Sequence, residues 1–84
     1  MTMGGKGRVL VANRGEIACR VTRAAHACGM ESVAIYAPQD AQALHVKTAD
    51  ASVALPGTGI PAYLDKKAVL DAAKKSGATC VHPG

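Results

Sequence analysis

Short apolar segments alternate with amphipathic segments along this chain, and the alternation limits its fold more than any other feature. The apolar segments have the length and the β-branched content of buried strands, and the amphipathic ones repeat with the period of a helix. Strands are predicted at 8–12, 32–36, 51–55 and 78–82. Helices are predicted at 16–28, 41–48 and 66–76. Strands that alternate with helices form parallel sheets whose right-handed crossovers can place helices on both faces. We therefore expect an α/β fold with a Rossmann-like parallel sheet of about four strands and helices on both faces.

Individual residues predict the ends and the faces of these helices. Gly29 and Gly77 are expected to end the first and third helices, and residues 56–61 form a loop. Asp40 and Asp65 are expected to cap the second and third helices. The residues expected to face the core are Ile17, Val21, Ala24 and Cys28 in the first helix, and Val69, Leu70 and Ala73 in the third. The opposite face of the first helix carries Glu16, Arg20 and Arg23, with Glu16 and Arg20 at a pairing distance of four residues.

The length of 84 residues supports one small domain. The chain contains two Tyr and no Phe or Trp, so its core must consist of small aliphatic side chains. Residues 1–7 are expected to be a flexible N-terminus and residues 8–84 the domain itself. The last predicted strand lacks the covering element that should follow it, so the domain is expected to be truncated at its C-terminal end.

Charge and cysteine content exclude several classes of protein. The net charge is +4, but the basic residues are scattered and have no aromatic neighbours, which indicates a solvated surface and no nucleic-acid partner. Three cysteines cannot form a complete disulfide framework, and Cys80 is expected to be buried in an apolar strand. No apolar segment approaches the roughly 20 residues of a membrane span. We expect a cytoplasmic protein that makes no membrane contact.

The turn after the first predicted strand is where a dinucleotide-binding fold carries its phosphate loop. That loop needs three glycines, but this turn has only Gly15, and the bulky Asn13 and Arg14 precede it. A dinucleotide site is therefore not expected. His26 is expected on a helix surface, His45 is expected to anchor its helix by a hydrogen bond, and no metal-ligand spacing is visible.

Several runs of residues carry a resemblance to a known family. They are Ala12-Asn-Arg-Gly-Glu-Ile-Ala18 with Cys19-Arg20, Val33-Ala-Ile-Tyr36, Ala43-Leu-His-Val46 with Ala49-Asp50, Tyr63-Leu-Asp65, and the final His82-Pro-Gly84. In this order they resemble the N-terminal, pre-ATP-grasp domain of the biotin carboxylase family. The resemblance implies a parent enzyme that uses MgATP and bicarbonate to carboxylate biotin within an acyl-CoA or pyruvate carboxylase.

The resemblance implies that the chain alone is not a working enzyme. Family members place their Mg²⁺ ligands, phosphate clamps and glycine-rich lid in later regions, so no catalytic or metal-binding residue is assigned to these 84 positions. ATP, Mg²⁺ and biotin belong to the parent, and no cofactor is expected to bind this chain by itself. Family members also continue after the His82-Pro-Gly84 motif with Tyr-Gly-Phe-Leu-Ser-Glu-Asn, which supports a truncation whose origin the sequence leaves open.

The resemblance and the expected sheet together give a set of residues adjacent to the parent's active site. Ligands of parallel sheets bind beyond the carboxyl ends of the strands. The residues predicted there are Asn13, Arg14, Gly15, Glu16, His82, Pro83 and Gly84. Their alternative role is purely structural. The resemblance also implies an interface role for Arg20 and Arg23, because the matching helix lies at the dimer interface of related bacterial subunits and Arg20 matches an arginine there. A solvated surface is the alternative.

The implied partners are the remaining ATP-grasp and C-terminal regions and the biotin carboxyl carrier domain. A homodimer with a second copy is a further option. Two rival functions remain open. One is a non-enzymatic interaction module that docks on a complete carboxylase. The other is the pre-ATP-grasp domain of another ATP-grasp ligase, such as a carbamoyl-phosphate synthase relative, which the Asn-Arg-Gly-Glu-Ile-Ala run argues against.

Overall fold

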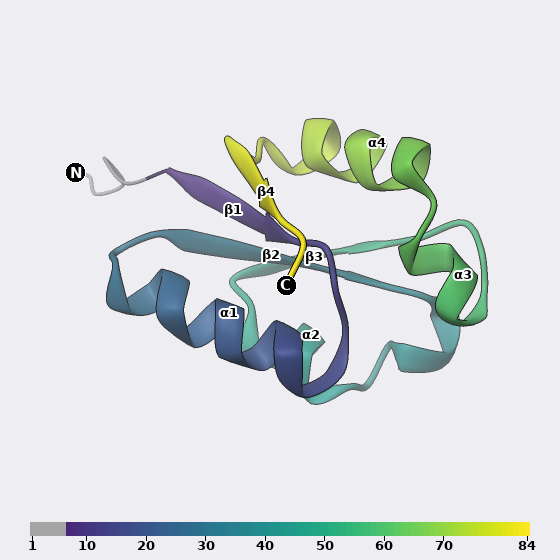
Figure 1. Cartoon of the computed structure of the whole chain (residues 1–84), viewed down its shortest axis with the longest axis horizontal. Helices are drawn as coiled ribbons and strands as arrows, with labels where there is room; N and C mark the ends of the chain where they lie inside the picture. Colours follow the sequence, from purple (N-terminus) through teal and green to yellow (C-terminus); the bar gives the residue numbers. More distant parts are fainter. Residues whose placement is uncertain (1–6) are drawn as a thin grey trace.

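Four parallel strands form the single sheet of the computed structural model, which describes residues 7–84 (Figure 1). The strands are β1 (Arg8–Val11), β2 (Glu31–Tyr36), β3 (Ala51–Ala54) and β4 (Cys80–His82). Their order across the sheet is β3-β2-β1-β4, with Leu10 of β1 opposite Val33 of β2 and Val81 of β4. The expected four-stranded parallel sheet is confirmed. Most of the N-terminus that was predicted to be flexible, residues 1–6, lies outside the described residues.

Helices cover both faces of the sheet, as predicted (Figure 1). The helices are α1 (Gly15–Ala27), the 3₁₀ turn η2 (Pro38–Asp40), α2 (Leu44–Thr48), α3 (Gly59–Tyr63) and α4 (Lys66–Ser76). The first two connections run in one direction across the sheet, so α1 and α2 share one face. The third connection returns past β1 to β4, which places α3 and α4 on the other face. The neighbouring strands β1 and β4 are therefore the switch point of the sheet, where the order of the strands changes direction.

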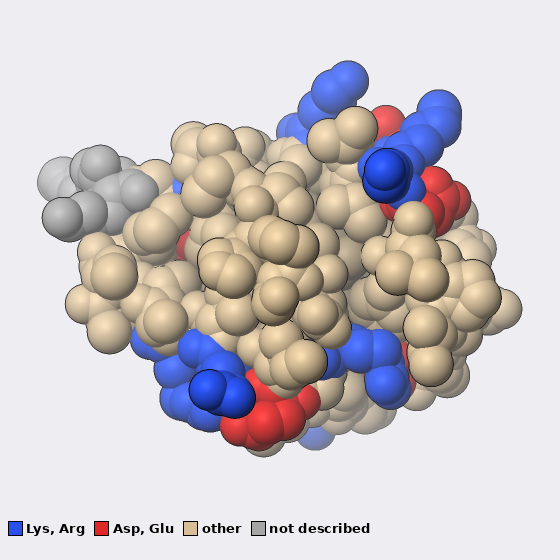
Figure 2. Space-filling model, viewed as in Figure 1, with Lys and Arg blue, Asp and Glu red and all other residues tan. Residues whose placement is uncertain are grey.

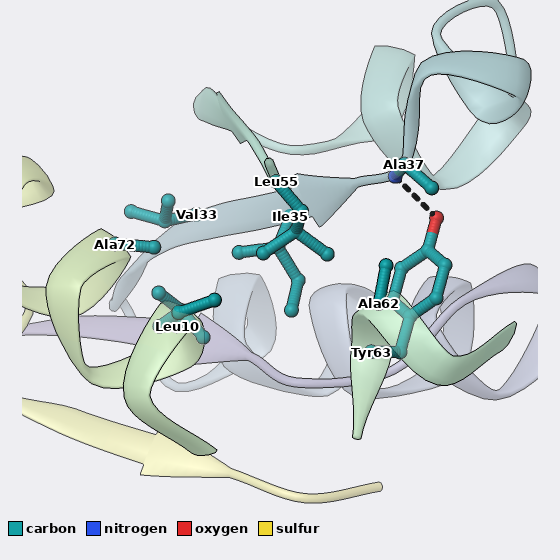
Figure 3. Close-up of a cluster of buried hydrophobic side chains, with 9 residues drawn as sticks. Leu10, Val33, Ile35, Ala37, Leu55, Ala62, Tyr63 and Ala72 are labelled. Carbon is teal, nitrogen blue, oxygen red and sulfur yellow. Dashed lines mark hydrogen bonds between the residues drawn. The ribbon is translucent and has the colours of Figure 1, made fainter. Parts of the chain in front are cut away.

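Successive residues of β1 and β2 face opposite sides of the sheet, so each strand contributes to two cores. The core on the α4 side combines strand residues with small helix residues (Figure 3). Its members are Leu10, Val33, Ile35, Ala37, Leu55, Ala62, Tyr63, Ala68 and Ala72. The ring of Tyr63 fills this core, and its hydroxyl accepts a hydrogen bond from the Ala37 N–H at 3.0 Å. Small alanines let α4 approach the sheet closely.

The predicted inner face of α1 is wrong. The buried residues of α1 are Ala18, Cys19, Thr22 and Ala25, whereas Ile17 is 50% exposed and both Ala24 and Cys28 are exposed. Both sides of this helix carry apolar residues, so its periodicity fits either orientation. The side with small residues packs on the sheet because it allows the closer approach.

The predicted inner face of α4 is confirmed for Val69 and Ala73, which pack against the core, and is wrong for Leu70. Ala68 and Ala72 are buried, Val69 and Ala73 are half-buried, and Leu70 is 57% exposed. The ends of this helix are as predicted, because the Asp65 carboxylate accepts a hydrogen bond from the Ala68 N–H at 3.1 Å and Gly77 has a positive φ of 73°. The alanine side again takes the position against the sheet.

Three local predictions also need correction. The second helix begins at Leu44, and Asp40 caps no helix there because it belongs to η2 and binds Arg14. The segment predicted as a loop at 56–61 contains the start of α3. Cys80 is exposed because β4 lies at the sheet edge, where all three of its residues are exposed. Within residues 7–84 no helix is long and apolar enough to cross a membrane.

Candidate functional site

The carboxyl ends of β1 and β4 lie at the switch point of the sheet, because the connection after β1 and the connection that reaches β4 run to opposite sides of it. Ligands of open parallel sheets bind at such a switch point. The strands remain joined there, because the Ala12 N–H donates to the His82 carbonyl at 2.8 Å. The structure brings two of the predicted groups of residues together at this edge. One follows β1 and the other ends β4.

Asn13 connects these two groups directly. Its side-chain amide donates to the Pro83 carbonyl at 3.1 Å, and its side-chain carbonyl accepts from the Arg14 N–H at 2.8 Å. Gly84 has a φ of +94°, and a Cβ at this position would lie 2.6 Å from Asn13 Nδ2. The residues that end β4 therefore pack directly on the turn that follows β1. The Gly84 N–H donates to His82 Nδ1 at 3.0 Å, so that ring nitrogen is the acceptor.

The Arg14 side chain points to a second cluster at the same edge. Its Nε and Nη2 donate to the two carboxylate oxygens of Asp40 at 3.0 and 3.1 Å, and its guanidinium carbon lies 5.9 Å from the centre of the Tyr63 ring. The Tyr63 hydroxyl donates to Asp40 Oδ2 at 2.7 Å. Asp40 therefore accepts three hydrogen bonds.

These contacts shift the pKa values of all three groups. The hydrogen bonds from Arg14 and then from Tyr63 hold the pKa of Asp40 below its ordinary value. The hydrogen bond to Asp40 raises the pKa of Arg14. Burial raises the pKa of Tyr63, with the Asp40 carboxylate adding to the rise. The Asp40 carboxylate is therefore stabilised in its charged form.

Gly15 and Glu16, also predicted near the site, do not join either cluster. Gly15 begins α1 with a positive φ of 65°, which explains the glycine at this turn. The Glu16 carboxylate pairs with Arg23 at 3.2 Å on the exposed surface of α1, and not with Arg20 as the spacing had suggested. Arg20 is exposed beside Ile17 and Val21.

Two apolar hollows flank β4. The carboxyl-end groove, of about 650 Å³, is lined by Asn13, Arg14, Tyr63, Leu64, Lys66 and Pro83, among other residues. The β4-side hollow, of about 690 Å³, is lined by Ile17, Arg20, Val21, Cys28, Cys80 and Val81, among others. In Figure 2, basic and acidic side chains lie toward α1 and α4, and the centre of this face is uncharged.

His26 and His45 have partners that decide their roles. His45 is buried and its Nε2 lies 3.0 Å from the Ile35 carbonyl, which confirms the predicted anchoring hydrogen bond. His26 is partly exposed, but its Nε2 lies 2.9 Å from Asp50 Oδ2 and 3.1 Å from Ser32 Oγ. His26 therefore lies on the helix surface, as predicted, and also joins α1 to the segment before β3. The Asp50 pKa is lowered by the Ser32 N–H and further by His26.

Sequence reasoning missed the roles of Asp40 and Tyr63. Asp40 lies 26 residues from Arg14 and 23 from Tyr63 along the chain, so no local spacing relates them. The one signal in the sequence was that Asp40 and Arg14 both follow predicted strands, whose carboxyl ends meet at one edge.

Comparison with known proteins decides the family. The family described as "Biotin carboxylase, N-terminal domain" matches residues 6–84. The chain belongs to this family. The biotin-dependent acyl-coenzyme A carboxylase alpha3 subunit of Mycobacterium leprae is 58% identical to it over 78 residues, which are 92% of this chain. The membership settles the choice between this family and the other ATP-grasp ligases that the sequence had left open.

Solved structures agree with this family membership. The biotin carboxylase domain of a single-chain bacterial carboxylase has a TM-score of 0.90 and 58% identity over 93% of this chain. The biotin carboxylase domain dimer of Hydrogenobacter thermophilus 2-oxoglutarate carboxylase, solved with MgADP, ADP and bicarbonate, has a TM-score of 0.88 and 45% identity over 93% of this chain. The chain spans only 13% of the M. leprae subunit and 18% and 17% of these two structures.

Proposed function

We propose that this biotin carboxylase N-terminal domain serves as a structural part of an enzyme that carboxylates biotin with ATP and bicarbonate, and that it does not catalyse the reaction alone. The observation that carries the proposal is the family match over residues 6–84, together with a site whose polar groups bind one another. A carboxylate that already accepts three hydrogen bonds has little capacity left for a metal ion or a substrate.

The described residues do not fit a MgATP site of their own. Mg²⁺ in ATP-dependent enzymes is held by carboxylates and by the phosphates, and cationic side chains stabilise the transferred phosphoryl group. No three metal-ligating side chains lie together within residues 7–84. The carboxylate at the carboxyl edge of the sheet, Asp40, is held by Arg14 and Tyr63. We propose that ATP, Mg²⁺ and biotin bind in the parent enzyme and not to this domain by itself.

The contribution of this domain is to shape the biotin and bicarbonate side of the complete site. The residues proposed for this role are Asn13, Arg14, Gly15, Glu16, His82, Pro83 and Gly84. The contact between Asn13 and Pro83 supports this role, because it holds the segment after β1 against the segment after β4 at the switch point of the sheet. Glu16 has the weakest support, since its side chain is exposed and pairs with Arg23.

The proposed partners follow from the two hollows and from the relatives. The remaining ATP-grasp and C-terminal regions would cover the apolar residues around β4, and the biotin carboxyl carrier domain would bring biotin to the completed site. Arg20 and Arg23 are proposed to lie at a homodimer interface, which the reported dimer of the H. thermophilus domain supports. A cytoplasmic location stays a prediction, because several relatives are mitochondrial subunits.

The proposal is tested with purified 84-residue chain supplied with ATP, Mg²⁺, bicarbonate and free biotin. We expect neither bicarbonate-dependent ADP release nor carboxybiotin, whereas a complete carboxylase in the same assay produces both. Bicarbonate-dependent activity that follows the chain through purification would overturn it. Adding the chain to a complete carboxylase tests the rival interaction module, which predicts that the chain changes the activity of an already complete enzyme.

A further inference from the structure

A continuous series of polar contacts crosses the carboxyl end of the sheet. It starts after β2, where the Ala37 N–H binds the Tyr63 hydroxyl, and continues through Asp40 to Arg14 after β1. Arg14 is adjacent to Asn13, which binds the Pro83 carbonyl after β4. Three strand ends that are far apart in the sequence are thus joined through side chains at the proposed site.

Asp40 is the central member of this series. Its side chain is 11% exposed, and both of its oxygens accept hydrogen bonds from the planar fork of Arg14. Hydrogen bonds between charged partners are stronger than neutral ones, and a two-point contact also fixes the orientation of the guanidinium. Lysine in place of Arg14 would keep the charge but would lose this orientation.

Tyr63 fixes Asp40 from the other side. The Tyr63 ring is buried in the core, and its hydroxyl is held by the Ala37 N–H while it donates to Asp40. The position of Asp40 is therefore determined by the core of the α4 face and not by its exposed turn alone. Arg14 in turn lies over the Tyr63 ring, so both of its contacts hold it in one place.

The effect reaches β4 through Asn13. The Asn13 side-chain carbonyl accepts from the Arg14 backbone N–H, and its amide holds Pro83, while Gly84 packs too closely on Asn13 for a larger residue. A displacement of Arg14 would therefore move the donor that orients Asn13. The segment leaving β4 would lose its fixed position as a result.

We propose that Asp40 is a positioning residue for the proposed biotin carboxylase site, acting through Arg14 and Asn13 to fix the backbone that leaves β4. Asp40 makes no hydrogen bond to Asn13 or Pro83 within residues 7–84, so its influence there is indirect. This role is separate from the contribution of Asp40 to overall stability, and the two can be measured apart.

Amide hydrogen exchange of the 84-residue chain separates them. Asp40→Asn is compared with Asp71→Asn, which removes an exposed carboxylate that pairs with Lys67 on α4. The amides of Ala12 and Arg14 report on the site, and the amide of Leu55, bonded to the Tyr36 carbonyl, reports on the same sheet end outside the series. We expect Asp40→Asn to accelerate exchange at Ala12 and Arg14 about tenfold more than at Leu55, as expected for loss of a charged hydrogen bond. Asp71→Asn should change none of the ratios.

Equal acceleration at all three amides, or no change, would overturn the positioning role. If Asp40→Asn does not fold, Arg14→Lys provides the same test, because it keeps the charge and loses the two-point contact. Arg14→Lys should accelerate exchange at Ala12 relative to Leu55, and an unchanged ratio would contradict the proposal.

The consequence for catalysis rests on the proposed function and is measured in a complete carboxylase that carries residues 6–84 of this chain. Asp40→Asn there should lower kcat/KM for free biotin at least several-fold more than it lowers ATP hydrolysis without biotin, because the shifted segment is proposed to face biotin. Equal losses would contradict positioning at the biotin side. Absence of activity before any substitution would instead count against the proposed function, so the two failures are distinct.

Discussion

The ion pairs of this domain differ in their contribution to stability because their side chains differ in exposure. Glu16–Arg23 and Lys67–Asp71 lie on exposed helix surfaces, where such pairs contribute about 0–1 kcal/mol to stability. Asp40 is nearly enclosed and receives hydrogen bonds from two side chains on different elements. Hydrogen bonds in which one partner is charged are stronger than neutral ones, and several of them on one carboxylate fix its position. The residues at the carboxyl edge therefore matter more for the structure than the numerous surface charges.

Tyr63→Phe should destabilise the domain by about 1–3 kcal/mol, because it leaves the fully buried Ala37 N–H without its acceptor. Tyr36→Phe is the matched control, since Tyr36 is half-buried and its hydroxyl makes no hydrogen bond within residues 7–84. Urea unfolding of both variants measures the difference. Equal stability of the two variants would show that the Tyr63 hydroxyl is replaceable by water.

Acid should destabilise the domain through Asp40 and Asp50. Their pKa values in the folded protein are below the value of about 3.9 expected for an unfolded chain. The unfolded chain therefore binds more protons in acid, so these carboxylates stabilise the fold above about pH 4 and lose that effect as the pH falls further. The free energy of unfolding, measured by urea from about pH 5 to about pH 3, should decrease less steeply for Asp40→Asn than for the unsubstituted chain. Identical slopes would mean that Asp40 has the same pKa in both states.

At the scale of elements, α4 has the most complete set of end signals. Asp65→Ala removes the acceptor of the Ala68 N–H and should cost about 0.5–2 kcal/mol of stability. Asp71→Ala, in the middle of the exposed face of the same helix, should stay within about 0.5 kcal/mol. Thermal unfolding of the two variants side by side measures both. A cost for Asp71→Ala that equals the cost for Asp65→Ala would argue that charge, not capping, stabilises this helix.

The elements themselves could be predicted because their signals are local. The four strands, the Asp65 cap of α4 and the glycine that ends α4, Gly77, all depend on neighbouring residues, and each is present. The faces of the helices could be predicted only in part, because α1 and α4 have apolar residues on two sides. Close packing on the sheet selects Ala18 over Ile17 and Ala68 over Leu70, and this choice depends on space that only the assembled sheet defines.

The candidate site could be predicted only in part, for a similar reason. The contact of Asn13 with Pro83 follows from the meeting of parallel strand ends, which strand order alone implies. Arg14 was predicted to lie adjacent to the site, but the sequence did not predict that its guanidinium binds Asp40. The pairing of two residues 26 positions apart depends on the path of the connection after β2, and η2 sets that path.

At the scale of the whole molecule, the surface is uneven. Large apolar residues are exposed around β4 and at the carboxyl-end groove, whereas the charged residues lie mainly toward the two helical layers (Figure 2). Ile17 and Val81 line the β4-side hollow, Ile60, Leu64 and Leu70 line the carboxyl-end groove, and the exposed Leu44 lies on α2 outside both. Contiguous exposed apolar surface on a small domain indicates a contact with other polypeptide. The position of most of it beside β4 supports the proposed contact with the remaining carboxylase regions.

A substitution at Arg20 distinguishes the two roles proposed for the exposed side of α1, a dimer interface and a solvated surface. It is exposed beside the β4-side hollow, while Arg23 is already paired with Glu16. In a complete carboxylase that carries this domain, Arg20→Glu should increase the dissociation constant of the dimer, because it introduces repulsion in a desolvated contact. Lys75→Glu on α4 is the control with the same change of charge. Analytical ultracentrifugation that gives equal constants for both variants would return Arg20 to the solvated surface.

Replacing the N-terminal domain of a relative with this chain tests whether the chain supplies that domain of a working biotin carboxylase. Residues 6–84 replace the matching segment of the M. leprae alpha3 subunit, which is 58% identical to this chain. The measurement is bicarbonate-dependent ATP hydrolysis coupled to carboxylation of biotin, with cooperative melting as the check on folding. We expect the exchanged subunit to carboxylate biotin and the 84-residue chain alone not to do so. An exchanged subunit that melts like its parent but shows no bicarbonate-dependent activity would contradict this role.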